Sequence, residues 1–260
     1  MNASFKTKLI DFVRSVSEKS PMPLSGFQDL PERVLYSSGI NFATCNGVIE
    51  KQGAPLTPHD LDEVIRFFDA KKLPFIWWTK DPFLETQGFQ FGGVMTGISL
   101  NTAEINTLSP SPPANVELKM VRTEEDIHLF CQVIADCCAF PLELKEQYER
   151  VSKIAMDRKE QIHLLAYSNG IPVATASLAI ASNSAKIHNC TTLPSYRNKG
   201  IGTFLCSTAS VEAKKRNYSQ VIAITMPKGM ASGLFKKLGY QKISTLPFYV
   251  YGASPDEIEK

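Results

Sequence analysis

The sequence lacks the cysteine patterns of metal sites and of disulfide frameworks. Its six cysteines form no CxxC pair and no His/Cys cluster at zinc-ligand spacing. Free cysteines are usually buried. We therefore predict reduced thiols, no structural disulfide and no bound metal. The six are Cys45, Cys131, Cys137, Cys138, Cys190 and Cys206.

Long apolar runs and a strong charge imbalance are also missing. The longest nearly unbroken apolar run, residues 171–181, is too short to span a bilayer. The first nineteen residues mix charged and apolar side chains at helical spacing and contain no apolar core of a signal peptide. The formal net charge of +2 gives no support for a nucleic-acid or membrane partner. We expect a cytoplasmic protein that binds neither.

One stretch divides the 260 residues. Residues 108–115, LSPSPPAN, contain three prolines and two serines, which disfavour both a helix and an internal strand. We predict a domain boundary there, with a first domain over residues 1–107 and a second over residues 116–260. Each is of ordinary domain size.

The second half predicts an α/β (α+β) fold. Asn169-Gly170 between two apolar stretches indicates a hairpin, and Thr123 before three acidic residues indicates a helix start. The resulting order of elements predicts a mixed, mainly antiparallel sheet flanked by helices. Strands are expected at 116–121, 162–168, 171–182, 185–193, 219–226 and 243–252, and helices at 124–138, at 142–156, after Gly200, and at 233–240.

The stretch LPSYRNKGIGTFL, residues 193–205, predicts an anion site. A strand that ends near a proline and a glycine-bearing turn before a helix leave the first helical N–H groups pointing into the turn. Gly200 and Gly202 let a ligand approach the backbone, and Arg197 and Lys199 add positive charge. No Gly-Lys-Ser/Thr follows, and Leu205 replaces the third glycine of a dinucleotide fingerprint. A plain turn with glycines is the alternative interpretation.

Two motifs together resemble those of a known family. Residues 197–202 fit R-x-x-G-x-G, and the helix at 233–240 ends in Leu-Gly-Tyr. With a buried strand between them, they resemble the acetyl-CoA-binding motif and the second signature of the GNAT (GCN5-related) N-acetyltransferases. The resemblance covers residues 116 to about 252. It implies a GNAT-like acyl-CoA N-acyltransferase fold.

The resemblance also implies a reaction and a set of binding residues. The acetyl group of acetyl-CoA would pass directly to a primary amine of a small molecule or of a peptide or protein, with no acyl-enzyme. The main chain of Thr192 and Leu193 would contact the pantetheine and thioester, and Arg197 would add charge. The backbone amides that would bind the diphosphate belong to Asn198, Lys199, Gly200, Ile201, Gly202 and Thr203. The sequence leaves open whether the protein forms a homodimer.

The catalytic residues depart from the family pattern. Phe235 stands where many members have a tyrosine that acts as the general acid toward the leaving thiolate. The remaining candidates for this acid are Tyr249, Tyr251 or a water. Lys186 stands where some members have a glutamate base, but His188 matches a histidine position of arylalkylamine acetyltransferases. With an ordinary pKa near 6.5, His188 would suit a base; a structural hydrogen bond is the other interpretation. These departures motivate an alternative function, a non-catalytic acyl-CoA-binding regulatory module.

The first half contains a weak internal repeat. Leu84-x-x-x-Gly88-Phe89 echoes Phe235-x-x-x-Gly239-Tyr240, but no R-x-x-G-x-G occurs in residues 1–107. We therefore expect a degenerate GNAT-like N-terminal domain without a cofactor loop, as in tandem members of the family. Its expected elements are a strand or hairpin at 39–49, a helix that begins at Thr57 and Pro58, a strand at 73–79, and a short helix and strand within 84–100.

Overall fold

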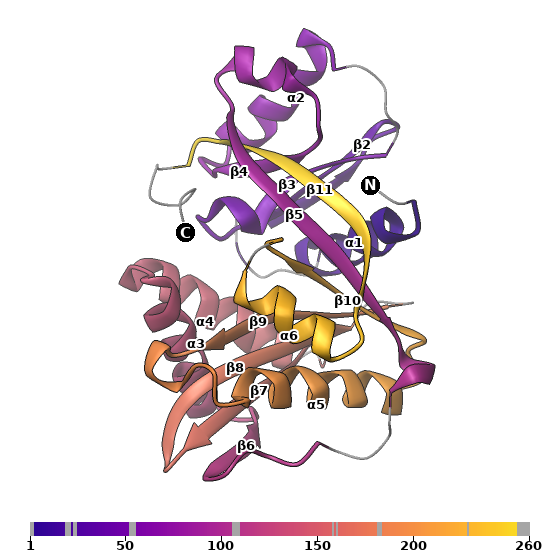
Figure 1. Cartoon of the computed structure of the whole chain (residues 1–260). Helices are drawn as coiled ribbons and strands as arrows, with labels where there is room; N and C mark the ends of the chain where they lie inside the picture. Colours follow the sequence, from indigo (N-terminus) through magenta and orange to yellow (C-terminus); the bar gives the residue numbers. More distant parts are fainter. Residues whose placement is uncertain are drawn as a thin grey trace. The chain divides into compact units, whose positions relative to one another are not determined.

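The computed structural model divides the chain into two compact units (Figure 1). Unit 1 comprises residues 1–95 and 244–260, and unit 2 comprises residues 96–243. The structure describes residues 3–18, 22, 25–51, 56–105, 110–157, 159, 161–180, 184–227 and 229–253; residues 108 and 109 of the predicted linker lie outside these ranges. Among the described helices, none has the length and apolar character needed to cross a bilayer.

Unit 2 contains the mixed sheet that the sequence predicted. Its strands lie in the order β5-β10-β9-β8-β7-β6, in which only β9 and β10 pair in parallel among the described pairings. The hairpin between β7 and β8 turns at Asn169 and Gly170, both with positive φ, as predicted. The strands are β5 (Gln90–Asn101), β6 (Val116–Met120), β7 (Gln161–Ser168), β8 (Ile171–Ile180), β9 (Ala185–Thr192) and β10 (Gln220–Thr225).

Helices cover both faces of this sheet (Figure 1). On one face, alternate residues of β7 and β8, such as Leu164 and Ala176, pack against α5 (Ile201–Lys215) and α6 (Met230–Lys237). On the other face, Leu165 packs against α3 (Glu124–Cys138), which is followed by α4 (Leu142–Asp157). A strand residue therefore faces either the α5 layer or the α3 layer, according to its parity.

Unit 1 repeats part of this architecture. Its strand order is β1-β2-β3-β4-β11, and β3 and β4 form a parallel pair joined by α2. A buried aromatic group that includes Phe68, Phe75 and Trp77 fills its core. The elements are α1 (Ala3–Glu18), β1 (Ser25–Asp29), β2 (Arg33–Ser38), β3 (Asn46–Glu50), α2 (Pro58–Asp69), β4 (Phe75–Trp78) and β11 (Gln241–Tyr251), with 3₁₀ turns at Ala43–Cys45 and Pro82–Gln87.

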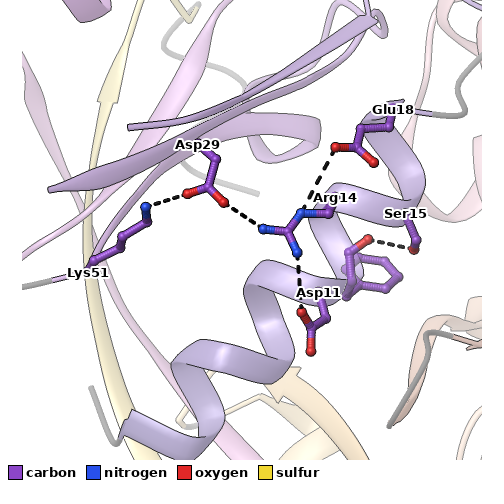
Figure 2. Close-up of polar contacts among 7 residues, drawn as sticks. Asp11, Arg14, Ser15, Glu18, Asp29 and Lys51 are labelled. Atoms are coloured by element: carbon purple, nitrogen blue, oxygen red, sulfur yellow. Dashed lines mark hydrogen bonds and ion pairs between the residues drawn. The ribbon is translucent and has the colours of Figure 1, made fainter. Parts of the chain in front are cut away.

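Ion pairs connect α1 to the strands of unit 1 (Figure 2). Arg14 lies between Asp11 and Glu18 of its own helix, at 3.8 and 4.0 Å, and bonds Asp29 of β1 at 2.7 Å. Lys51, next to β3, pairs with the other oxygen of Asp29. The side chains of these pairs are partly or fully exposed, so the pairs contribute little stability, and we infer that they serve to position α1.

The two halves of the sequence exchange a strand. The second part of β5 pairs with β10 in unit 2, from Thr96 to Asn101, although it follows the first-half elements. Conversely, the end of β11 pairs with β4 in unit 1, from Tyr249 to Tyr251. The compact units therefore divide at 95/96 and 243/244, whereas we predicted the boundary at 108–115. A Pro/Ser-rich composition identifies an irregular segment of the chain. It does not identify the distant strand with which an apolar strand pairs.

The predicted internal repeat has a structural counterpart. Gly88 and Gly239 both take positive φ, at 83° and 86°. In each case the next aromatic N–H closes back on the residue five positions earlier: Phe89 on the Leu84 carbonyl at 3.2 Å, and Tyr240 on the Phe235 carbonyl at 3.0 Å. This is the glycine-terminated helix end of a Schellman motif, and a strand follows it in both halves.

Candidate functional site

Strand β9 is irregular just before the glycine loop. Thr175 of β8 lies opposite Thr191, whereas Ser177 lies opposite His188, so β9 has one residue too many between them. Asn189 absorbs the difference with a φ of 51°. The Thr175 hydroxyl donates to the Asn189 carbonyl at 2.7 Å and lies 2.7 Å from the Thr191 hydroxyl. Buried Thr175 thus holds a β-bulge that redirects the end of the strand.

The redirected end of β9 leaves main-chain groups facing away from β8. The described parallel pairing of β9 with β10 ends at Lys186 and Ile222. Further along, the Leu193 N–H donates to the Val173 carbonyl at 2.9 Å. Bonded and non-bonded residue pairs alternate along an antiparallel ladder, so the N–H and carbonyl of Thr192 point to the opposite edge. Thr192 therefore presents a donor on the β10 side.

The two residues predicted to contact pantetheine through the main chain, Thr192 and Leu193, differ in which backbone groups are already bonded. Leu193 uses its N–H on Val173 and its carbonyl on the Tyr196 N–H, at 2.9 Å each. Leu193 thus has no main-chain donor left for a ligand. The carbonyl of Thr192 accepts a hydrogen bond from Arg197 Nε at 3.0 Å. The N–H of Thr192 is therefore the main-chain donor available to a ligand at this point.

The loop itself turns tightly and is exposed. A 3₁₀ turn covers Pro194–Tyr196, and positive φ values follow at Asn198 (62°) and Gly200 (82°). Asparagine and glycine are the residues that adopt this conformation most readily. Residues 198–200 are solvent-exposed, so the turn delivers an open backbone segment to the start of α5.

The N-terminus of α5 has no side-chain cap. Gly200 occupies the cap position, the first turn contains no acidic residue, and the first helical bond runs from the Phe204 N–H to the Gly200 carbonyl at 3.0 Å. Across the described part of the chain, no acceptor is bonded to the N–H groups of residues 198–203. These are the six amides predicted from the sequence. Together with the helix dipole they form a site suited to an anion.

The two glycines serve different purposes. Gly200 requires glycine because of its φ of 82°, and among the described residues a Cβ there would come within 4 Å of Pro113 Cγ alone, at 3.6 Å. Gly202 does not have a positive φ, but a Cβ there would lie 3.1 Å from Leu234 Cδ1 of α6 and 3.6 Å from Thr192 Oγ1. A bulky residue at Gly202 would therefore press on α6 as well as on a ligand, so Gly200 is the cleaner position for a test.

The basic residues of the loop are not equivalent. Arg197 folds back so that its Nε bonds the end of β9, in a partly buried position. Lys199 is exposed and lies 5.0 Å from the centroid of the Tyr196 ring. Arg197 therefore fixes the loop to the strand, and Lys199 is the charge that faces solvent beside the six amides.

His188 lies in a polar row that crosses three strands. His163 of β7 lies opposite Ser177 of β8, which lies opposite His188 of β9, and His163 Nδ1 is 2.8 Å from the Ser177 hydroxyl. Burial, followed by the charges of Lys186 and His163, lowers the pKa of His188 well below 6.5. His188 is thus neutral at pH 7, and its conjugate acid is stronger than that of an ordinary histidine.

Tyr249 and Tyr251 belong to unit 1. The Tyr249 hydroxyl donates to Glu85 at 3.0 Å, and burial together with this carboxylate raises its pKa. A raised pKa makes a tyrosine a weaker acid. Tyr251 packs against Phe75 and Phe89, with ring centroids 5.4 and 4.8 Å away. Phe235 of unit 2 is buried beside Tyr240, 4.9 Å between centroids, and carries no proton to donate.

Sequence reasoning missed the residues that hold the bulge. The bulge is held by Thr175, Asn189 and Thr191. The signal available was the asparagine inside a strand, where this residue is disfavoured except at irregular positions. Among the described residues, no three His, Cys, Asp or Glu side chains gather in a way that would hold a metal ion.

Comparison with known proteins finds a family match over the part of the chain that contains this site. Residues 128–240, which include the bulge, the loop and both signature motifs, match the acetyltransferase (GNAT) family. This part of the chain is similar to the GNAT acetyltransferases. A Bacillus subtilis (strain 168) protein that carries the name "Putative acetyltransferase" is 24% identical over 133 residues, which are 50% of this chain and 86% of that protein.

Solved structures resemble the whole chain. A GCN5-related N-acetyltransferase from Kribbella flavida aligns with a TM-score of 0.70 and 15% identity, over 98% of this chain and 96% of that one. A tandem GNAT protein from the clavulanic acid biosynthesis pathway aligns with a TM-score of 0.58 and 12% identity, over 98% of each chain. At these identities the likeness shows the fold: a GNAT-like, two-domain arrangement.

Proposed function

We propose that the protein is an acetyl-CoA-dependent N-acetyltransferase that transfers the acetyl group directly to a primary amine. Similarity to the GNAT acetyltransferases supports acyl transfer in general. The observation that carries the specific proposal is the run of six backbone N–H groups, residues 198–203, for which the described residues supply no acceptor. A diphosphate has the charge and the acceptor oxygens to use them.

Each part of the site would have a separate task. The amides of residues 198–203 would bind the diphosphate of coenzyme A, with Lys199 adding charge from the solvent side. The N–H of Thr192, which faces away from β8, would bond the pantetheine arm or the thioester carbonyl. Arg197 would keep the loop and the strand in register through its bond to the Thr192 carbonyl. Orientation of two reactants supplies a large share of the rate of such a transfer.

The chemistry requires one proton acceptor and one proton donor. The amine must lose a proton, its nitrogen forms a bond to the acetyl carbon, and the carbon–sulfur bond breaks to release the thiol of coenzyme A. We propose His188 as the acceptor: it is neutral at pH 7, although its low pKa makes it a weak base. The donor to the sulfur would be Tyr251, Tyr249 or a water, and the bond from Tyr249 to Glu85 disfavours Tyr249.

We further propose that residues 1–107 contribute a degenerate GNAT-like domain and residues 116–260 the cofactor-binding one. Both compact units contain a parallel strand pair joined by a helix, β3–α2–β4 in unit 1 and β9–α5–β10 in unit 2. In unit 1 a complete side-chain cap, Thr57 with Asp60, occupies the helix start. The corresponding end is therefore closed to an anion.

A non-catalytic acyl-CoA-binding module is the second candidate. It is favoured by the chemistry of the predicted catalytic residues: Phe235 carries no proton, Tyr249 is bonded to a carboxylate, and His188 is a weak base. None of these residues contributes to the binding of a diphosphate, so binding would survive without turnover.

Two measurements on the purified protein separate these functions. Isothermal titration with acetyl-CoA tests binding, and release of free thiol in the presence of an amine panel tests transfer. Binding with thiol release that depends on one class of amine supports the enzyme. Binding without release for any amine or peptide supports the regulatory module. Absence of both would contradict the two proposals together.

A further inference from the structure

Two cysteine side chains meet beside the candidate site. The Cys206 thiol of α5 lies 3.5 Å from the Cys190 sulfur of β9, as a weak donor to it. Cys206 is 1% exposed, whereas Cys190 is partly exposed and directly follows the bulge residue Asn189. Both are free thiols in this structure. Sulfurs at this separation are in van der Waals contact, about 1.5 Å further apart than in a disulfide.

The pair lies on the contact between β9 and α5. Gly202 is four residues before Cys206 and so lies one turn earlier on the same helix face. Thr192 is two residues after Cys190, and its Oγ1 lies 3.6 Å from the Cβ position of Gly202. The contact of Cys190 with Cys206 and the approach of Thr192 to the Cβ position of Gly202 therefore follow one another toward the loop of residues 193–200.

We propose that Cys190 and Cys206 form a reversible regulatory disulfide when the protein meets a peroxide. The Cys190 thiolate takes an oxygen from the peroxide and becomes a sulfenic acid, while hydroxide or alkoxide leaves. The Cys206 sulfur then attacks the Cys190 sulfur, the sulfur–oxygen bond breaks, and water leaves with the thiol proton. Two thiols are oxidised by two electrons, and one peroxide is reduced.

The environments of the two thiols set this order. The bond to Cys190, together with burial, raises the pKa of Cys206 well above 9.0, so Cys206 remains a protonated thiol. The first oxidation therefore falls to Cys190, which is the partly exposed member. Asn189 beside it already departs from regular strand geometry, so the approach of the sulfurs requires only local adjustment of an irregular segment.

The disulfide would alter the candidate acetyl-CoA site, which rests on the function proposed above. A bond at Cys190 and Cys206 draws α5 and β9 together one turn from Gly202. Leu234 and Thr192 lie so near Gly202 that even a Cβ there would be 3.1 and 3.6 Å from them, so α5 and β9 are already closely packed at this point. The start of α5 must then shift relative to the end of β9. We expect oxidation to weaken acetyl-CoA binding by at least about tenfold.

Peptide mapping of the whole protein after treatment with hydrogen peroxide tests the disulfide itself. We expect one cross-link, between the peptides that contain Cys190 and Cys206, a fall from six to four alkylatable thiols, and full recovery with dithiothreitol. Cys190→Ser and Cys206→Ser should each abolish the cross-link, and the Cys45→Ser protein, changed in unit 1, should form it normally. No cross-link in the folded wild-type protein, or one between other cysteines, would overturn the proposal.

Titration with acetyl-CoA before and after oxidation tests the consequence. The reduced protein gives the reference affinity, and the oxidised wild type should bind at least about tenfold more weakly while Cys206→Ser is unaffected by peroxide. A disulfide that forms without a change in affinity would overturn the regulatory role. If the reduced protein itself failed to bind acetyl-CoA, the proposed function would fail, and the peptide map would still decide whether the disulfide forms.

Discussion

The two parallel crossovers of this chain share a topology and differ at one helix end. In unit 1, α2 begins with Thr57, which bonds the Asp60 N–H at 3.2 Å, while Asp60 accepts from the Thr57 N–H at 2.9 Å. In unit 2, α5 begins with Gly200, which has no side chain. At the start of α2 the side chains of Thr57 and Asp60 bond backbone N–H groups, and Asp60 places a negative charge there. Helix α5 leaves its donors open and is preceded by two basic residues.

This difference shows how a repeated backbone unit acquires or loses a ligand site. A capping box stabilises α2 by about 1 kcal/mol, and the same bonds remove the donors that a phosphate would use. Gly200 contributes no such stabilisation to α5. A helix end that is less stable by itself is thus the one prepared for an anion, and the predictions below exchange or remove features of the two ends.

The largest effect should come from placing an acid at the start of α5. Gly200→Asp puts a carboxylate beside the open amides, and Gly200→Asn supplies a neutral side chain of the same shape that also tolerates positive φ. We expect the Asp protein to bind acetyl-CoA about 100-fold more weakly than the Asn protein, measured by isothermal titration. Equal affinities for two equally stable proteins would show that charge at this end does not matter.

Removal of the acid at the start of α2 should change stability and leave binding alone. Burial would raise the pKa of Asp60, but bonds from Arg33 and Thr57 outweigh it and lower the pKa to about 2. The folded value lies below the unfolded value of 3.8, so the contribution is complete above that value and is lost as the pH falls to about 2. Asp60→Asn should cost about 2 kcal/mol at pH 7 in urea unfolding.

The control for Asp60 is Asp62→Asn, an exposed acid on the same helix, which should be nearly neutral. The difference between the Asp60→Asn protein and the wild type should shrink below about pH 4 and disappear near pH 2. A pH-independent difference would contradict the assigned charge effect, and weaker acetyl-CoA binding would contradict the contrast between the two helix ends.

Arg197 should act through its bond to β9 rather than through its charge. Glutamine places its amide nitrogen where Arg197 has Nε, so Arg197→Gln keeps a donor for the Thr192 carbonyl, whereas Arg197→Met has similar length and no donor. We expect acetyl-CoA affinity within about twofold of wild type for the Gln protein and about fivefold weaker for the Met protein. Equal losses in the two proteins would assign Arg197 to charge.

The smallest effect should come from the exposed charge. Lys199→Gln should weaken acetyl-CoA binding about threefold at low salt and by less at 1 M salt, because an exposed charge is screened. The matched position outside the loop is Lys215, at the other end of α5, where Lys215→Gln should have no effect. A loss at Lys199 that persisted at high salt would mean a direct, desolvated contact.

Much of the second half could be predicted because its signals are local. The hairpin at Asn169-Gly170, the capping box at Thr123 and the glycine turn at Gly200 depend on a few adjacent residues, and the structure contains each of them. The exchange of β5 and β11 could not be predicted in this way. Both strands are apolar, and their partners in the sheet are chosen by packing between distant segments.

Some features of the candidate site have local sequence signals, and others depend on residues that are distant in the sequence. Main-chain donors follow from the loop sequence, so the six amides can be predicted from the sequence alone. The pKa of His188 and the bond of Tyr249 to Glu85 depend on burial and on residues far away in sequence, and neither has a local signal. The contact of Cys190 with Cys206 is of the same kind, since it joins a strand to the following helix across the loop.

The central claim is that the uncapped start of α5 binds the diphosphate of coenzyme A through backbone N–H groups. A crystal structure of the complex with coenzyme A tests it most directly. We predict diphosphate oxygens about 3 Å from amide nitrogens within residues 198–203. A coenzyme bound elsewhere, with these amides turned to solvent or satisfied by a side chain, would contradict it.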